Sequence, residues 1–550
     1  MRIAPDAHKY AKARHTTMRD ARRHMWPIWR AIASVYLPYT HPWLLDGRTE
    51  KKISLSENYI TSTGLQSVRV QTAGLMNGIT SPTRPWIKYG IGPDDSKLSI
   101  ATRKWLYQSA AITHMVLARS NYYNTQAMSY FDIGLFGISG KQIFEDYRDV
   151  IRVQRYNVGE FYVAFDSSGR LYEYSRECTK TLQELHDDFG EENLPPQLRD
   201  EYKNPISRGR LYRTIHFVSR KIEGLPSYVQ QREWRELYYL QDGNIADGDV
   251  LSAKGYREQP GTFPRWGGEL LYGNSPGLDA YADMCELIQL LLDKGVGIEK
   301  MVKPPMLYDA QLRNQKKSTA PDGYSYVANL ANFTGARPLY QTQIPVQELR
   351  ADIQEVKSSI QEIFHNPLFN MISQLDTVRS ANEIDARREE KLVLLSHFLE
   401  RFENEALDPD IERVFNICMR AGLFPDPPAE VRNNEIDIQY ISILTTAQRA
   451  LNTVPMERML QAVGEVINVA PNVLDLINFD EYVYTYGRDI GVQPAIFNDT
   501  DQVAALRQAR NEREQQAALM EQSGHIIDAA RNLSETKVQG GANALERVLG

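Results

Sequence analysis

The sequence has few cysteines and no long apolar run. Its three cysteines, Cys178, Cys285 and Cys418, lie far apart and form no Cys-x-x-Cys motif, so we expect packed, reduced thiols. No stretch approaches the roughly 20 apolar residues that a membrane helix needs, and the amino terminus has no apolar signal-peptide core. We therefore expect a protein that has no membrane partner and is made and kept in a reducing, soluble compartment.

Motifs for metal and nucleotide chemistry are missing as well. No His-Glu-x-x-His occurs, and His365 and His397 are isolated in the sequence. The segment around Gly140-Lys141 has the Gly-Lys of a phosphate loop. However, Leu135 stands where the earlier glycine is needed and Gln142 where a hydroxyl is needed. We predict a turn here, no cofactor, no metal and no ATPase activity.

One enzyme hypothesis deserves a test, because Gly273-Asn274-Ser275-Pro276-Gly277 is a literal Gly-x-Ser-x-Gly. A strand-like segment precedes it and a helix follows, as in a hydrolase nucleophile elbow, and His365, His397 and His525 lie downstream. The residue after such a serine normally donates its backbone N–H to the oxyanion, but Pro276 has none. A helix N-cap at Ser275 followed by proline in the first turn explains the same residues. The serine hydrolase remains the alternative to a non-enzymatic protein.

The charge is modest and unevenly distributed. The formal net charge of −7 argues against a protein that grips nucleic acid over its whole surface. Locally, residues 1–25 form a basic arm, which we expect to be a helix with a solvated face. The loop between residues 302 and 344 is also basic, with Lys303, Arg313, Lys316, Lys317 and Arg337 against only Asp309 and Asp322.

The middle of the chain has two apolar seams of helical spacing. Residues at alternating steps of three and four follow Ser275, and a second series precedes His365. Such seams suit long contacts between helices, within one hairpin or between copies. The seam residues are Leu278, Tyr281, Cys285, Ile288 and Leu292 in the first helix and Val346, Leu349, Ile353, Val356, Ile360 and Ile363 in the second.

The flanking regions predict an α+β protein that is mainly helical. Residues 161–165 and 170–174 flank a turn and predict a hairpin, with further strands near 212–218, 236–240 and 249–252. Helices are expected within residues 55–76 and 98–131, with Trp86 buried between them. A capping box at Ser380–Glu383 starts another helix that ends at Leu407-Asp408-Pro409, and Ile411–Cys418 forms a short one. The segment after residue 500 has a weak helical stripe.

Several of these segments together resemble one known family. Phe263-Pro264-Arg265-Trp266-Gly267, Tyr272–Gly277 and Lys303-Pro304-Pro305 occur in order, followed by the segments around Ala381-Asn382-Glu383-Ile384 and Ile411–Phe415 and by Gly422-Leu423-Phe424-Pro425. In order and spacing they resemble the portal proteins, or head-to-tail connectors, of short-tailed bacteriophages, from about Trp26 to about Arg449.

The resemblance implies a ring, typically of twelve copies, with a central channel at one capsid vertex. It implies a subunit divided into 1–54 (amino-terminal arm), 55–271 (wing), 272–302 (descending stem helix), 303–345 (clip), 346–364 (returning stem helix), 365–379 (channel loop), 380–499 (crown and wing helices) and 500–550 (carboxy-terminal helical tail). The basic residues named above would belong to the clip. The channel loop would present His365, Asn366, Phe369, Asn370 and Gln374 to the DNA.

The resemblance also implies partners and a location. Double-stranded DNA would pass through the channel during packaging and ejection. The ring would contact the major capsid and scaffolding proteins, the large terminase subunit during packaging, and tail adaptor or nozzle proteins afterwards. It would be assembled in the host cytoplasm and would reside in the virion, at the capsid vertex.

Overall fold

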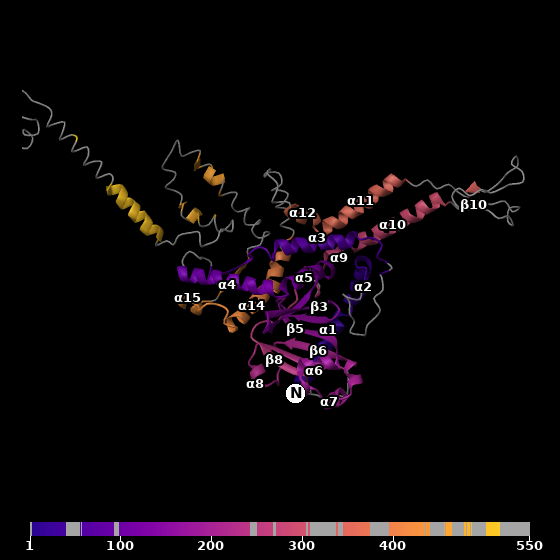
Figure 1. The fold of residues 1–550 in the computed structure, drawn as a ribbon. Coiled ribbons are helices and arrows are strands. Elements are labelled where there is room, and N and C mark those ends of the chain that lie inside the picture. The colour runs from indigo at the N-terminus through magenta and orange to yellow at the C-terminus, as the bar shows by residue number, and fades with distance from the viewer. Residues whose placement is uncertain are drawn as a thin grey trace, which may run out of the picture. The chain divides into compact units, whose positions relative to one another are not determined.

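The computed structural model describes most of the first 440 residues and scattered positions after them (Figure 1). The described residues are 3–39, 56, 58–92, 98–241, 250–267, 271–303, 306–307, 337–338, 345–373, 395, 397–434, 436–440, 456, 458–461, 463–464, 478–479, 481–483, 486, 502–516 and 528.

The chain divides into two compact units. Unit 1 comprises Met1–Lys88, Ser109–Pro425 and Ile438–Gln448, and unit 2 comprises Tyr89–Gln108, Asp426–Asp437 and Arg449–Gly550. Unit 2 contains α15 (Ala429–Asn433) and the exposed helical residues 502–516. Three elements cross a boundary between the units: β1 (Ile87–Gly90), α4 (Ile100–Arg119) and β12 (Asp437–Tyr440). All other elements named below belong to unit 1.

A five-stranded antiparallel sheet with the order β4-β5-β6-β7-β8 forms the centre of one part of unit 1. Its strands are β4 (Phe161–Phe165), β5 (Leu171–Thr181), β6 (Leu211–Ser219), β7 (Trp234–Leu240) and β8 (Ser252–Tyr256). The hairpin predicted around residues 161–174 is confirmed. The strand expected at 249–252 begins only at Ser252.

The two faces of this sheet are covered by different helices, because alternate residues of a strand point to opposite faces. On one face, α1 (Pro5–Arg22) packs through Ala7, Ala11 and Met18. Its partners on the sheet are Ile215, Phe217, Leu237 and Tyr239. On the other face, α6 (Leu182–Phe189) and α7 (Pro196–Tyr202) pack against Leu240, Leu251, Tyr212 and Tyr238. Short turns η2 (Glu191–Asn193), η3 (Pro205–Gly209) and α8 (Ser227–Gln230) connect these elements.

The amino-terminal arm has the solvated face expected from its charge, with Lys9, Lys12, Arg19 and Arg23 exposed, and its other side packs on the sheet. Arg14 forms an ion pair with Glu173 at 2.7 Å, and the Arg22 side chain is buried. The sequence did not predict the buried side of α1, which lies against the sheet and uses part of the basic side chains as internal hydrogen-bond donors.

Among the described residues, a large core lies where several other long helices meet. These are α2 (Met25–Tyr36), α3 (Thr63–Gly78), α5 (Tyr122–Phe136), α10 (Tyr281–Val302) and α11 (Val346–Ile363). Trp29, Val68, Leu135, Met284 and Ile360 are fully buried within it. Trp86 is also buried, as predicted. The helices, together with the sheets, confirm the α+β, mainly helical fold class.

The smaller elements frame that core. A three-stranded sheet has the order β3-β2-β9, with β2 (Gly140–Asp146), β3 (Val150–Tyr156) and β9 (Gly261–Thr262). The helix expected to end at Leu407-Asp408-Pro409 instead continues through a π-helical turn, η5 (Glu403–Leu407), into α14 (Asp408–Arg420). Pro409 does not stop the helical path, because after the π-helical turn it lies in the first turn of α14, where proline is tolerated.

Candidate functional site

Within unit 1, the chain segment at the start of the first seam helix meets the end of α5 at a junction made largely of backbone. Gly137, which ends α5 with φ +85°, and Gly273, with φ +75°, have conformations that favour glycine. A Cβ on Gly273 would lie 2.6 Å from the Gly137 carbonyl oxygen, and one on Gly277 would lie 2.6 Å from the carbonyl oxygen of Leu135. The Gly-x-Ser-x-Gly glycines are therefore explained by this close approach of two chain segments.

Ser275 has a structural role at this junction. Its hydroxyl accepts a hydrogen bond from the backbone N–H of Leu278 at 2.9 Å and donates one to the Leu135 carbonyl at 3.0 Å. Ser275 is the N-cap of α9 (Pro276–Asp279), as predicted, and is buried in extended backbone rather than exposed on a strained elbow. A nucleophile needs a base that accepts its hydroxyl proton, whereas this proton is already donated to a carbonyl.

The Pro-Arg-Trp segment that follows β9 is held by two side-chain contacts. The guanidinium of Arg265 contacts the Glu405 carboxylate through Nη2 at 2.6 Å and Nε at 3.3 Å. The neighbouring ring of Trp266 stacks on Phe398 with ring centroids 4.2 Å apart. Bidentate arginine–carboxylate pairs fix orientation as well as distance. The pair thus fixes the segment before α9 to η5, a connection across 140 residues of sequence.

A buried ion pair joins β2 to α14. The Lys141 ammonium bonds to the Asp410 carboxylate and to the Gln126 side chain, and both charged residues are about 1% exposed. Asp410 also accepts hydrogen bonds from Thr262 at 3.0 Å and Tyr122 at 3.2 Å. Burial raises the pKa of Asp410 and lowers that of Lys141, and the attraction within the pair opposes both shifts. The lysine of the failed phosphate-loop match is therefore a packing residue.

The two seam helices pack side by side in opposite directions, and Ser359 near the end of α11 donates to Asp283 near the start of α10 at 2.6 Å. The single first helix expected from residue 272 is divided into α9 and α10, because Ala280 (ψ 5°) turns the chain and is fully buried. In the chain between α10 and α11, the strands β10 (Met306–Leu307) and β11 (Arg337–Pro338) pair antiparallel.

Most of the residues in the two predicted seams are buried or half-buried. Ile353 and Ile360 are buried, and Val346 is half-buried. Another group is partly buried against the main core: Leu278, Tyr281, Cys285, Ile288, Leu349, Val356 and Ile363. Leu292 is 45% exposed, and in α10 the most buried side chains are Met284 and Leu287, one position away from the predicted seam. The outer part of α10 exposes further apolar side chains, namely Val296, Ile298, Met301 and Val302.

The segment expected to be an exposed loop from residue 365 is helical as far as the structure describes it. His365 turns the corner after α11 with φ +55°, and α12 (Asn366–Ser373) follows. Asn366 and Phe369 are buried, whereas Asn370 is exposed. The Asn-Pro pair starts a helix here instead of breaking one, because proline fits a first turn. Gln374 lies outside the described residues.

Phe369 is seated directly on the backbone of α3. A Cβ on Gly74 would lie 2.2 Å from two ring atoms of Phe369, so the ring occupies the space that any other residue at position 74 would fill. Neither residue's partner can be read from the sequence, since the two positions belong to helices far apart along the chain.

Of the basic residues expected in the clip, the structure describes Lys303, which is exposed, and the backbone of Arg337 in β11. Arg313, Lys316 and Lys317 lie outside the described residues. Among the described residues, no cluster of three metal-ligating side chains occurs, and no helix has the length and hydropathy to span a membrane. The three cysteines are free thiols.

Sequence reasoning missed Glu405, the Lys141–Asp410 pair and Gly74. A signal existed for both members of the ion pair. Asp410 falls on the apolar face that carries Ile411 and Val414, and Lys141 falls inside a strand. A charge in such a position needs a buried partner, but the sequence does not say which one.

Comparison with known proteins gives a family match and curated relatives. The model of the family described as "Bacteriophage head to tail connecting protein" matches residues 8–497. The chain is 30% identical over 528 residues to the probable portal protein of Bordetella phage BPP-1, covering 94% of this chain and 93% of that one. It is 28% identical over 486 residues to the portal protein of Salmonella phage epsilon15, covering 87% and 86%.

Proposed function

Because this chain belongs to the bacteriophage head-to-tail connecting protein family, we propose that it is the portal protein of a short-tailed phage. In this role it forms the ring at one capsid vertex through which double-stranded DNA is packaged and ejected. The family match over residues 8–497 carries this conclusion, since it includes every segment described above as part of the junction.

The helix pair α10–α11 supports the assembly. A single chain rarely leaves a row of large apolar side chains in water, yet Leu292, Val296 and Val302 of α10 are 45%, 48% and 72% exposed. Neighbouring copies would cover these side chains if α10 and α11 form the stem. A head-to-tail contact repeated by rotation closes into a ring, and we expect twelve copies.

The segments between and after the stem helices receive roles by the same reasoning. The basic residues Lys303, Arg313, Lys316, Lys317 and Arg337 would form the clip, which docks the terminase during packaging and a tail adaptor afterwards. The channel segment would start at His365, where α12 follows. Its exposed Asn370 would face the DNA, together with Gln374 further along, while Phe369 holds the helix on α3.

We expect no bond-making chemistry. The family relatives are named as portal proteins, and the Ser275 hydroxyl proton is held by the Leu135 carbonyl. Nothing in the geometry favours the serine hydrolase alternative. The protein would be assembled in the host cytoplasm with its thiols reduced, alongside scaffolding and major capsid proteins, and would remain at the capsid vertex.

The test is electron microscopy and native mass measurement of the purified full-length protein, together with an esterase assay. The expected result is a ring with a central opening, a mass near twelve copies and no hydrolysis above buffer. A monomer whose esterase activity disappears in Ser275→Ala would replace this proposal with the hydrolase.

A further inference from the structure

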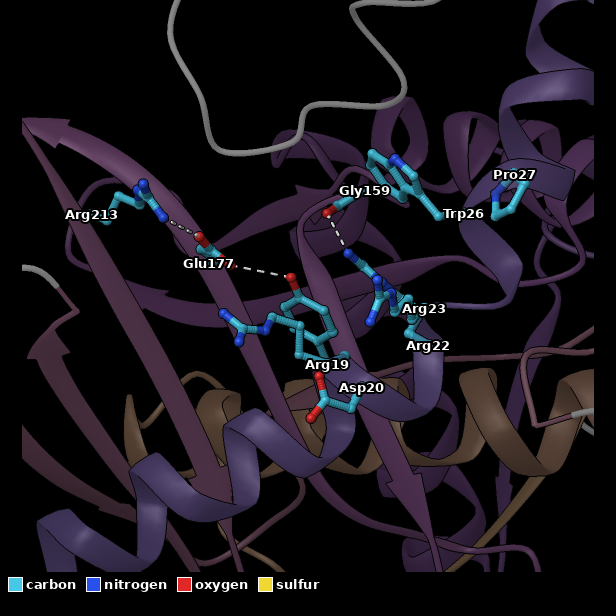
Figure 2. A pocket seen from close by; sticks show the side chains of 10 residues that line it. Arg19, Asp20, Arg22, Arg23, Trp26, Pro27, Gly159, Glu177 and Arg213 are labelled. Carbon is cyan, nitrogen blue, oxygen red and sulfur yellow. Dashed lines mark hydrogen bonds and ion pairs between the residues drawn. The ribbon is translucent and has the colours of Figure 1, made fainter.

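A pocket of about 640 Å³ lies at the end of α1, on the α1 face of the five-stranded sheet (Figure 2). Four arginines and two carboxylates line it, together with an aromatic wall. The lining residues are Arg19, Asp20, Arg22, Arg23, Trp26, Pro27, Gly159, Tyr162, Glu177 and Arg213. The surplus of positive charge and the volume are those of a binding site for an anionic group.

Part of the lining is committed to the fold. Arg22 donates to the carbonyl oxygens of Phe161 at 2.6 Å, Gly159 at 3.0 Å and Val158 at 3.1 Å. Glu177 accepts from the Tyr162 hydroxyl at 3.1 Å and pairs with Arg213 at 3.6 Å. These contacts build the floor of the pocket.

Two arginines at the rim of the pocket, Arg19 and Arg23, are not held by contacts of this kind. Arg19 and Arg23 are exposed, and within the part of the chain that the structure describes their guanidinium groups have no hydrogen bond or ion pair. The positive field of this site acts on its neighbours: the pKa of the buried His15 is lowered to about 4, first by burial and then by Arg19 and Arg22. We call the group formed by Arg19, Arg23, Arg213 and the aromatic side chains of Trp26 and Tyr162 the arginine pocket.

An acidic surface lies elsewhere on the same sheet. Asp187 and Asp188 end α6, Glu191 and Glu192 follow in η2, and all four residues are exposed. Asp188 pairs with Lys180, and Asp187 accepts hydrogen bonds from Gln183. Among the described residues, the carboxylates of Glu191 and Glu192 form no hydrogen bond or ion pair at contact distance, although Glu191 adds to the effect of Asp200 in raising the pKa of Lys203. We call these four residues the acidic turn.

Strand register places the arginine pocket and the acidic turn on opposite faces of the sheet. Glu177 pairs with Ile215, and Thr179 pairs with Arg213, so the pocket side chains share the face on which Ile215 contacts α1. Lys180, which holds Asp188, pairs with Tyr212 on the face that α6 and α7 cover. One subunit therefore carries a basic recess on one face and an acidic projection on the other.

We propose that the arginine pocket receives the acidic turn of the neighbouring copy of this chain in the ring. This inference rests on the proposed function, because a ring needs a heterologous contact in which two different patches of each subunit meet. Opposite charge on opposite faces supplies such a pair of patches. Complementary charge of this kind selects the partner and fixes register.

A nucleic acid fits the pocket less well. Asp20 and Glu177 lie among the arginines and would repel a phosphate backbone, whereas binding driven by phosphates needs an uninterrupted basic track. A peptide turn presents carboxylates to arginines, backbone N–H groups to Asp20, and an apolar edge to Trp26. The acidic turn supplies exposed carboxylates, whereas its Phe189 packs against Tyr238 of the same subunit.

The test uses charge reversal in the full-length protein. Variant P carries Arg19→Glu and Arg23→Glu, and variant T carries Glu191→Arg and Glu192→Arg. Each alone places like charges across every contact, so we expect the assembled fraction at low salt to fall at least about tenfold. An equal mixture of P and T can alternate around a ring with every contact complementary, so we expect assembly to recover in the mixture. Native mass measurement and electron microscopy give the readout.

The controls separate assembly from folding. Lys9→Glu with Lys12→Glu makes the same charge change on exposed α1 residues outside the pocket and should assemble as wild type does. The milder Arg19→Gln with Arg23→Gln should assemble less, with a weaker dependence on salt than wild type. Circular dichroism and melting of each subunit should be unchanged, because all substituted side chains are exposed.

Every outcome decides the inference. Recovery in the mixture, with neither variant assembling alone, supports it. Normal assembly of P and T alone, or no recovery on mixing folded variants, overturns it while leaving the portal function intact. Wild-type protein that forms no ring overturns both, so the two failures are distinguishable. Competition by a short DNA duplex, at salt where wild-type rings are stable, would assign the arginine pocket to nucleic acid instead and also overturns it.

Discussion

Removing one member of the Lys141–Asp410 pair should destabilise unit 1 far more than removing both charges. In Lys141→Met, the buried Asp410 carboxylate keeps only the hydrogen bonds from Thr262 and Tyr122. Losing one partner of a buried ion pair costs about 3–5 kcal/mol, whereas neutralising both costs much less. In Lys141→Met with Asp410→Asn, the amide oxygen can still accept from Thr262, and the amide NH2 can donate to the Tyr122 hydroxyl, so most of the loss should be recovered.

The expected signal is a shift in the melting temperature of the purified protein. At about 2–4 °C per kcal/mol for a domain of 150–250 residues, and less for a larger one, either single variant should melt roughly 5–10 °C below wild type. The double variant should lie within about 3 °C of it. Scanning calorimetry or dye-monitored melting gives the readout.

The pH dependence gives a second, independent readout. Without Lys141, only the hydrogen bonds from Thr262 and Tyr122 oppose the effect of burial, so the pKa of Asp410 in the folded protein should rise further above its unfolded value of about 3.9. A carboxyl whose folded pKa is raised holds its proton better in the folded state, so stability falls as pH rises above the unfolded pKa. The gap between Lys141→Met and wild type should therefore widen from about pH 4 upward. A gap that is constant with pH, or a double variant as unstable as either single one, would refute the reasoning.

Three further perturbations follow from other contacts. Ser275→Ala should lower the free energy of unfolding by about 1 kcal/mol through loss of the α9 cap, which should appear as a small drop in melting temperature. Loss of an esterase activity without a drop in melting temperature would contradict the structural role. Gly74→Val should force Phe369 off α3, because no space exists for the new side chain, and protease cleavage within 366–373 should become faster. Gly74→Val with Phe369→Ala should be cleaved no faster than Phe369→Ala alone. Burial lowers the pKa of His15 and of His114 to about 4, so each must gain a proton on unfolding and stability should fall as pH decreases from about 6.5 to 4. His15→Gln should make that fall shallower in a melting series, and an unchanged slope would count against it.

Features set by neighbouring residues were predictable from the sequence. The Ser275 cap needs only the serine and the proline after it, and the 161–174 hairpin needs only a turn between two alternating runs. The resemblance to the family, and from it the proposed function, followed from the order of the short motifs. Each of these signals is local or depends on order alone.

Features set by distant residues were not predictable. The partner of Lys141 lies in α14, and the cover of Gly74 is a ring in α12. His365-Asn366-Pro367 reads equally as a breaker and as a helix start, and only the burial of Phe369 against α3 decides between them. The buried side of the basic arm was not predictable, because its partners, such as Glu173, belong to a strand more than a hundred residues away.

The glycine junction between α5 and α9 has a mechanical consequence for the two segments that meet there. At Gly137, Gly273 and Gly277 the two chain segments approach so closely that a Cβ at these positions would collide with the other segment. Side chains can absorb a displacement by changing rotamer, but peptide groups in direct contact have no such freedom. A displacement of the segment that precedes α9 would therefore be passed directly to the end of α5.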